Sequence, residues 1–267
     1  MIGVAVGDIA GSRFEFSDCG TKDFELFNEE CDFTDDTIMA VAVAEAIMNC
    51  GIKAPEEELH DAFIFSMRKY GKEYPHPTGG YGASFTRWLR IEDPKPYGSY
   101  GNGSAMRVAA CGYAADSLST AEKLARCSAE VTHNHPEGIK GAVCVAACIY
   151  LAKTGSSKEQ IKSVVENRFY PLKENVEEIR KHYSFNESCQ GTVPQAIQAF
   201  LESKNFEDAI RNAVYLGGDS DTLGAITGGI AEAYYGVPEN IKKKARSYLT
   251  KDMLEVIDKF EKEYRKI

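Results

Sequence analysis

The chain has 267 residues, of which 43% are hydrophobic and 27% are charged, as in an ordinary soluble globular protein with a sizeable core. Its formal net charge of −9 argues against the basic surface on which DNA- and RNA-binding proteins depend. No apolar run approaches the roughly 18 residues of a membrane span, and the N-terminus lacks the basic segment of a signal peptide. We therefore expect a single cytoplasmic domain over residues 1–267 that is monomeric and binds neither a nucleic acid polymer nor a membrane.

Hydrophobic residues recur with helical spacing along most of the chain, and convincing strand alternation is nearly absent. The sequence therefore predicts an all-α protein. An apolar helix is expected at 38–48, directly after Asp35 and Asp36, and another runs from Pro55 toward Tyr70 with acids in its first turn. The later helices are expected at 104–115, 120–131, 136–153, 158–166, 194–202, 206–216, 222–235 and 240–264.

Glycines recur at every fourth residue near both ends of the chain. Gly3, Gly7 and Gly11 would share one face of an N-terminal helix, and Gly224 and Gly228 repeat this spacing. A glycine costs a helix about 1 kcal/mol relative to alanine. The spacing therefore suggests two deeply buried helices that approach another backbone closely, although ordinary tight helix packing explains each run equally well.

Two segments rich in Pro, Gly and Tyr interrupt the helices, at 74–81 and 93–103. Their aromatic content is not typical of a flexible linker. We expect ordered loops on a helical scaffold, which is where binding residues often lie.

Two acidic clusters stand directly before helices, Thr-Asp-Asp-Thr at 34–37 and Asp-Ser-Asp-Thr at 219–222. Either cluster alone is typical of a helix start, because Thr and Asp cap well and acids favour the first turn. As a pair they offer only carboxylate and hydroxyl oxygens, which suit Mg²⁺, Mn²⁺ or Ca²⁺ better than Zn²⁺. The pair indicates a metal-dependent hydrolase, if the fold brings the two clusters together.

A third acidic element contains Asp8 and Glu15. These residues would share a helix face if the segment stayed helical, and they would add two carboxylates to an apolar stretch. The alternative is that Glu15 forms a surface ion pair with Arg13.

Taken together, four motifs resemble the ADP-ribosylglycohydrolase family, which includes the dinitrogenase reductase-activating glycohydrolase and the eukaryotic ADP-ribosylhydrolases. They are Gly-Asp followed by Glu at 7–15, Thr-Asp-Asp-Thr at 34–37, Gly-Asn-Gly-Ser-Ala-Met-Arg at 101–107 and Gly-Gly-Asp-Ser-Asp-Thr at 217–222. No single motif is decisive, but their order and spacing cover nearly the whole chain. The resemblance implies a single compact orthogonal bundle of helices with a binuclear site for two Mg²⁺ or Mn²⁺ ions.

The resemblance also implies roles for particular residues. It assigns the metal ions to Thr34, Asp35, Asp36, Asp219, Asp221 and Thr222. It places Glu15 at the edge of the metal site near the scissile bond. Our own mechanistic hypothesis is that Asp35 or Asp36 acts as general base while touching a metal, and that Glu15 either assists protonation of the leaving group or rearranges to admit substrate. It implies substrate contacts by Ser99, Tyr100, Gly101, Asn102, Gly103, Ser104, Met106 and His133. The implied substrate is ADP-ribose attached through C1″ of its distal ribose to a protein side chain.

The segment 99–104 is compatible with this substrate. Its glycines would let backbone N–H groups approach a pyrophosphate, and the start of the following helix would favour an anion, although an ordinary turn fits the segment as well. Tyr100 is expected to stack on the adenine ring. His135, next to Pro136, is expected at the rim or in a structural role rather than as a metal ligand.

The predicted reaction is hydrolysis of the C1″ glycosidic bond, in which oxocarbenium-like charge develops. In the family that the chain resembles, the arginine-directed bacterial enzymes carry an acidic residue just before Gly-Asn-Gly. Here Ser99 stands three residues before Asn102 and the nearest preceding acid is Asp93, so the resemblance implies an O-linked, serine-type substrate rather than an N-linked, arginine-type one. Two alternatives stay open. One is a two-metal nucleotide phosphohydrolase, and the other is a non-catalytic relative that binds ADP-ribose or is purely structural.

Overall fold

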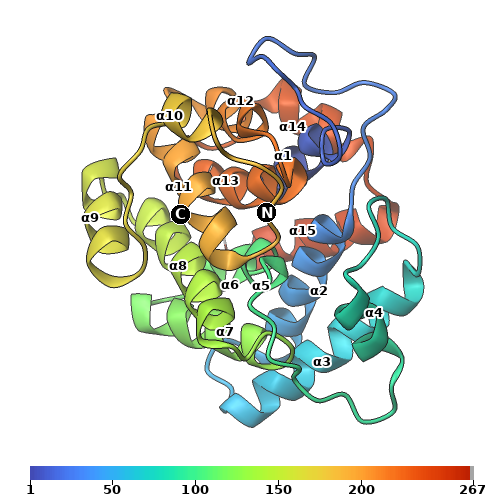
Figure 1. Ribbon diagram of the computed structural model, residues 1–267. Coiled ribbons are helices and arrows are strands. Elements are labelled where there is room, and N and C mark those ends of the chain that lie inside the picture. Colours follow the sequence, from blue (N-terminus) through green and yellow to red (C-terminus); the bar gives the residue numbers. More distant parts are fainter. Residues whose placement is uncertain (265–267) are drawn as a thin grey trace.

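The computed structural model describes residues 1–264, and the regular elements in this range are helices (Figure 1). Backbone pairing of the β type is limited there to two isolated bridges, Thr34 with Thr78 and Gly101 with Ser188. The all-α prediction is therefore confirmed. None of the described helices is long and apolar enough to cross a membrane.

The helices follow one another through short turns and a few longer loops. Their bounds are α1 (Ile2–Ser12), α2 (Asp35–Cys50), α3 (Glu56–Glu73), α4 (Ala83–Arg90), α5 (Gly103–Met106), α6 (Ala109–Ala114), α7 (Leu118–Glu130), α8 (Pro136–Lys153), α9 (Lys158–Arg168), α10 (Val176–Arg180), α11 (Cys189–Glu202), α12 (Phe206–Leu216), α13 (Ser220–Tyr235), α14 (Glu239–Arg246) and α15 (Lys251–Tyr264). Helices α8 and α12 begin and end where the sequence predicts. The two segments rich in Pro, Gly and Tyr form the loops that precede α4 and α5.

Two predicted helices are each divided in the structure. The helix expected at 104–115 is interrupted at Arg107 and Val108, where the Arg107 side chain turns into the core and donates to the Ser128 carbonyl oxygen at 2.6 Å. The helix expected at 240–264 ends at Arg246 and resumes as α15. There the Ser247 hydroxyl donates to a backbone carbonyl three residues earlier, a local bond that competes with helix continuation.

Other helix boundaries also differ from the prediction. Helix α11 begins well before Pro194, because the Ser188 side chain accepts from the Gly191 N–H and caps an earlier start. Helices α4 and α10 were not predicted. The first starts without a side-chain cap, whereas the second has a capping box of Asn175 and Glu178 that the sequence did contain.

Helices α1 and α13 pack against each other as an antiparallel pair through their glycines. A Cβ atom added to Gly7 would lie 1.8 Å from the Gly224 carbonyl oxygen, and one added to Gly11 would lie 2.3 Å from that of Ser220. The prediction of a very close backbone approach is therefore correct. Because the two helices run in opposite directions, the N-terminus of α13 lies beside the C-terminus of α1.

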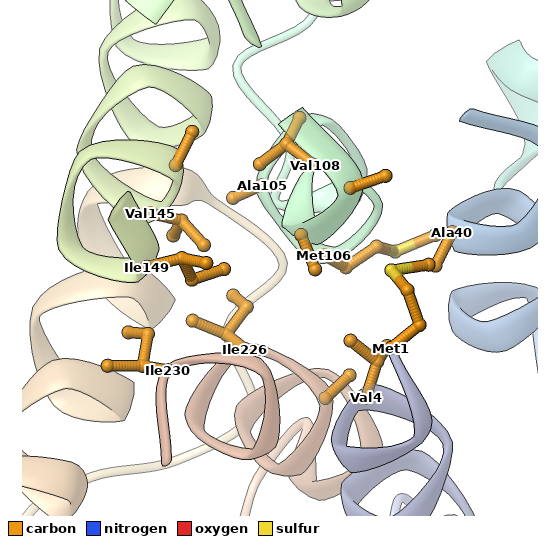
Figure 2. Close-up of a cluster of buried hydrophobic side chains, with 14 of the residues drawn as sticks. Met1, Val4, Ala40, Ala105, Met106, Val108, Val145, Ile149, Ile226 and Ile230 are labelled. Carbon is orange, nitrogen blue, oxygen red and sulfur yellow. The ribbon is translucent and has the colours of Figure 1, made fainter. Parts of the chain in front are cut away.

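The hydrophobic core lies where α1, α2, α8 and α13 converge with the segment around α5 and α6 (Figure 2). Val4, Ala40, Ile149 and Ile226 point into it from four different helices and are at most 1% exposed. Burying a large aliphatic side chain stabilises the fold by roughly 1.5–3 kcal/mol. This core holds α1, α2 and α13 in fixed relation, so the ends of these helices have a rigid base.

Candidate active site

The two acidic clusters, far apart in sequence, meet at the N-termini of α2 and α13. The Thr222 hydroxyl donates to Oδ2 of Asp36 across 3.4 Å. The same oxygen lies 3.4 Å from the Thr34 hydroxyl, which also accepts from the Asp36 N–H as the N-cap of α2. The capping role and the clustering of carboxylates are therefore both present, because the helix starts are what bring the acids together.

Asp8, fully buried on α1, fixes the start of α2. Its Oδ2 accepts from the backbone N–H groups of Thr34 and Thr37 at 3.0 and 3.1 Å, and its Oδ1 accepts from the Thr34 hydroxyl at 2.8 Å. Burial raises the pKa of Asp8 to about 6, even though these hydrogen bonds favour the ionised form. Asp8 thus positions the first turn of α2, and with it the neighbouring carboxylates.

Glu15 reaches the site from a turn rather than from a helix face shared with Asp8. Helix α1 ends at Ser12, so the expectation of a common helix face is wrong. The alternative pairing with Arg13 is not what the described residues show either, because the Arg13 guanidinium lies against Glu30.

The surroundings of Glu15 suit proton transfer. Burial, together with the negative charges of Asp219, Asp8 and Glu187, raises the pKa of Glu15 to about 7. A carboxyl group with a pKa near neutrality can both release and accept a proton at physiological pH.

The carboxylates of Asp35, Asp36 and Asp221 crowd together without a neutralising side chain. Burial raises the pKa of all three well above the usual range, and the charges of neighbouring acids raise it further. Within residues 1–264 no Lys or Arg forms an ion pair with them, and Oδ1 of Asp36 is buried without a hydrogen-bond partner. An unpartnered buried oxygen in a set of hard oxygen donors fits a divalent cation such as Mg²⁺.

A cavity of about 310 Å³ opens above the carboxylates, and it is large enough for part of a nucleotide-sized ligand. The predicted site residues in its wall are Glu15, Asp35, Asp36, Ser99, Gly101, Asn102, Gly103, Met106, His133, Asp219, Asp221 and Thr222. A larger cavity of about 610 Å³ between α3 and α4 is lined by apolar and basic side chains, with Asp61 as its one acid. The smaller cavity is therefore the candidate active site.

The glycine-rich loop before α5 is tied to the acidic site by Asn102. Its Nδ2 donates to Oδ2 of Asp219 at 2.6 Å and to the Thr192 hydroxyl at 3.0 Å. Its backbone N–H donates to the Glu187 carbonyl at 2.6 Å. Asn102 is thus a direct link between the predicted substrate loop and the predicted metal ligands.

The backbone N–H groups of this loop are only partly available to a ligand. The N–H of Gly101 donates to the Ser99 hydroxyl and that of Asn102 to Glu187, so both are used within the protein. Among the described residues, the N–H groups of Gly103 and Ser104 have no such partner. Of these two residues Gly103 lines the cavity, whereas Ser104 is fully buried, so within the described loop the backbone N–H of Gly103 is the one left at the cavity wall.

Three predicted site residues lie outside the main cavity. Thr34 is fully buried and bonded to Asp8, and the Ser104 hydroxyl donates to the Gly138 carbonyl behind the loop. Tyr100 is 52% exposed and lines a neighbouring cavity, with its ring 5.3 Å from that of His135. Their roles in metal or substrate binding stay predictions.

The cavity also contains residues to which the sequence assigned no role. Tyr97, Arg107, Phe185 and Glu187 line it. Arg107 belongs to a quoted motif, yet nothing in the motif showed that its side chain turns inward. Glu187 is brought to the cavity by the bridge between Gly101 and Ser188, a tertiary contact without a sequence signal.

A second group of metal-ligand types lies between α3 and α7. His60, Cys127 and Glu130 each place one ligand atom within 4.8 Å of the others. Glu130 already accepts from His60 at 3.0 Å and from Arg126 at 3.0 Å, and the guanidinium charge opposes a cation there. Burial raises the pKa of the Cys127 thiol to about 11, whereas a metal-binding cysteine is a thiolate. This group is best explained as an ion-paired cluster.

The chain is similar to proteins of one family over nearly its whole length. A family model described as ADP-ribosylglycohydrolase matches residues 1–266. The ADP-ribosylhydrolase ARH3 of Homo sapiens is 28% identical, over 95% of this chain and 90% of that protein. The ADP-ribosylarginine hydrolase Tri1 of Pseudomonas putida (strain GB-1) is 29% identical, over 92% of this chain and 73% of that protein.

The fold also has a solved counterpart. A structure described as an ADP-ribosylglycohydrolase-related protein complex superposes with a TM-score of 0.65 and 24% identity, covering 92% of this chain and 95% of that one. At this identity the likeness is one of fold.

Proposed function

Since the chain belongs to the ADP-ribosylglycohydrolase family and is thus a glycosidase, we propose that it is a metal-dependent enzyme that cleaves the C1″ bond of ADP-ribosylated protein side chains and releases ADP-ribose. The observation that carries the proposal is the contact between Asp36 and Thr222, which makes one carboxylate-rich site from two distant clusters. We further propose that the enzyme works as a cytoplasmic monomer and needs two Mg²⁺ or Mn²⁺ ions.

The residues present fit a two-cation centre. Its proposed ligands are Thr34, Asp35, Asp36, Asp219, Asp221 and Thr222. When bound, the cations would polarise water and ribose hydroxyls and relieve the repulsion among the carboxylates. Asn102 would keep Asp219 oriented toward them through its bond of 2.6 Å.

Two kinds of carboxyl group divide the proton transfers in this proposal. Asp35 or Asp36 accepts the proton of the attacking water, since both line the cavity. Glu15 donates a proton to the leaving oxygen, because a pKa of about 7 leaves it partly protonated at neutral pH. The base must be ionised and the acid protonated. Bound cations would keep Asp35 or Asp36 ionised in spite of their burial, whereas Glu15 lies outside the proposed ligand set.

We propose an O-linked, serine-type substrate, supported by Ser99 at the cavity wall and by the position of Asp93. Asp93 is 77% exposed in its side chain, is paired with Lys95, and does not line the cavity. One observation favours the arginine-linked alternative: the carboxylate of Glu187 lies at the exposed rim of the cavity, where a guanidinium leaving group would find an anion. The name of the relative Tri1 points to that chemistry for Tri1 itself.

Release of ADP-ribose from three substrates tests these proposals. Serine-linked, arginine-linked and 1″-O-linked ADP-ribose are each incubated with the protein and Mg²⁺, with and without a chelator. We expect chelator-sensitive release that is fastest for an O-linked substrate. Release that is unchanged by the chelator contradicts the metal site, and faster cleavage of the arginine-linked substrate contradicts the linkage preference.

The released nucleotide separates this activity from that of a two-metal phosphohydrolase. Glycosidic cleavage yields intact ADP-ribose, whereas cleavage at the pyrophosphate yields AMP. We expect ADP-ribose with no AMP. Binding of ADP-ribose without turnover of any of the substrates would instead indicate a non-catalytic relative.

A further inference from the structure

Arg107 is a buried cation at the back of the active-site cavity. It is 1% exposed, lines the cavity, and has no carboxylate partner among the described residues. Its Nη2 donates to the Ser128 carbonyl at 2.6 Å and to the Thr132 hydroxyl oxygen at 2.8 Å. Burying a charge without a counter-ion is unfavourable, so we expect this cation to have a function at the cavity.

The hydrogen bonds of Thr132 fix the proton on the next residue. The Thr132 oxygen lies 2.7 Å from Nδ1 of His133 and accepts from Arg107, which can only donate. The hydroxyl has a single hydrogen, and within residues 1–264 the one acceptor in reach is Nδ1 of His133. The arrangement that uses this hydrogen has Nδ1 as its acceptor and therefore unprotonated, and a neutral ring then carries its own hydrogen on Nε2.

The protonated nitrogen faces the substrate loop. A Cβ atom on Gly103 would lie 3.2 Å from Nε2 of His133, and one on Gly101 would lie 3.5 Å from it. His133 lines the cavity, and in the described part of the chain its Nε2 has no hydrogen-bond partner. The other groups that face the ring are Tyr97, whose ring centroid is 5.7 Å away, and the Arg107 cation.

We propose that Arg107 and Thr132 are positioning residues that hold His133 as a neutral imidazole with its hydrogen on Nε2, which donates to a phosphate oxygen of the substrate. The identity of the acceptor rests on the proposed function, whereas the state of the ring follows from the protein alone. Arg107, which lines the cavity one side chain further back, then supplies a positive charge behind the imidazole.

In this arrangement the positive charge and the hydrogen-bond donor belong to different residues, Arg107 and His133. Burial, and to a lesser extent the Arg107 charge, lowers the pKa of His133 well below its usual range, so the ring stays neutral around pH 7. A guanidinium does not titrate in this range. The donor therefore keeps one form throughout the neutral range, and phosphate binding does not depend on imidazole protonation.

The state of the ring is tested by long-range ¹H–¹⁵N NMR on the full chain, with the signals of His133 identified from their loss in His133→Gln. We expect the wild type and Thr132→Ser to show a single tautomer with the hydrogen on Nε2, since serine keeps the hydroxyl. Thr132→Val removes the hydroxyl and is expected to lose this single-tautomer pattern. A wild-type ring with its hydrogen on Nδ1, or an unchanged pattern in Thr132→Val, overturns the proposal.

The link to substrate is tested by steady-state kinetics on an ADP-ribosylated peptide. Thr132→Val is expected to raise KM about tenfold with less than about a twofold change in kcat, and Thr132→Ser to restore KM. Ser128→Ala is the matched control, because Ser128 is also buried against Arg107 but does not contact His133. An equal rise of KM in Ser128→Ala indicates general loosening and contradicts the proposed relay.

The two readouts distinguish failure of the relay from failure of the proposed function. If the wild type releases no ADP-ribose from any substrate, the proposed function is wrong, and the NMR pattern still decides the state of His133. If the wild type is active and the NMR pattern holds but KM is unchanged in Thr132→Val, His133 does not donate to the substrate.

Discussion

The two carboxylate oxygens of Asp36 have different surroundings. Oδ2 lies 3.4 Å from the hydroxyls of Thr34 and Thr222, whereas Oδ1 is buried without a partner. Leaving such an oxygen unsatisfied costs about 1–3 kcal/mol or more when it is charged. A bound cation removes this cost, so the same atom that destabilises the metal-free fold is available as a ligand.

Asp36→Asn tests this dual role because it keeps the shape and removes the charge. We expect ADP-ribose release to fall at least about 100-fold, since a lost ligand weakens metal binding and activity together. The metal-free variant should be more stable than the metal-free wild type, measured as the free energy of unfolding. Asp61→Asn, which changes an acid in the cavity between α3 and α4, serves as the control and should leave both quantities unchanged.

Glu15 is expected to shape the pH dependence of the reaction. A general acid must be protonated, so kcat/KM should fall as pH rises through the pKa of Glu15, which is about 7 before cations bind and lower once they do. Glu15→Gln should abolish this fall on the alkaline side and lower the maximum rate. A pH–rate profile with the same alkaline limb in the variant would assign the acid to another group.

At the scale of the elements, the antiparallel contact of α1 with α13 is what aligns the two halves of the site. The Gly7 and Gly224 backbones approach so closely that neither position has room for a side chain. Any shift of α1 along α13 also moves Asp8, and Asp8 holds Thr34 at the start of α2. Packing in the core and geometry in the site are therefore coupled through one helix pair.

Gly7→Ala should show this coupling, because the added Cβ would lie 1.8 Å from a backbone carbonyl oxygen that cannot move independently. We expect a loss of about 1–3 kcal/mol in the free energy of unfolding, with weaker metal binding measured by calorimetry. Gly229→Ala on α13 is the matched control. There the new Cβ would make ordinary contacts at 3.4 Å, and alanine favours the helix, so stability should be unchanged or higher.

The sequence predicted the helices better than it predicted the site, because helices follow from local patterns whereas the site depends on tertiary contacts. Helix α8 begins at Pro136 and could be read from the sequence, as could the glycine spacing of α1. The inward turn of Arg107 could not, because it depends on carbonyl and hydroxyl groups of α7 and the turn that follows it. The acidic clusters could be recognised because several carboxylates and hydroxyls stand together directly before two helices. No pattern around Glu187 predicts that it lines the cavity.

For the whole molecule, the buried acids make metal-free stability depend on pH in an uncommon direction. The folded-state pKa values of Asp8 and Glu15 are raised to about 6 and 7, so the folded state binds protons that the unfolded chain does not. Stability should therefore rise as pH falls from about 7.5 to about 5.5. Above the folded pKa values both states are ionised, and the stabilising contribution of protonation is lost.

Thermal and chemical unfolding with and without Mg²⁺ check this expectation. At neutral pH, Mg²⁺ at about 100 times its dissociation constant should add about 2.7 kcal/mol, and the gain should shrink as protons replace the cation at lower pH. The metal-free slope should be shallower in Asp36→Asn. A metal-free protein that loses stability throughout this acidification contradicts the crowded-carboxylate description.

The pairing of α1 with α13 also has a consequence during synthesis. Helix α1 precedes the other described helices in the chain, is buried along its whole length, and packs most closely on α13, which begins at Ser220. On the ribosome this apolar helix therefore has no α13 to pack against until most of the chain has emerged. Contacts between such distant segments slow folding and leave surfaces open to aggregation. Expression of this protein should accordingly depend on chaperones that shield nascent apolar helices, and chains that stop before α13 should be insoluble.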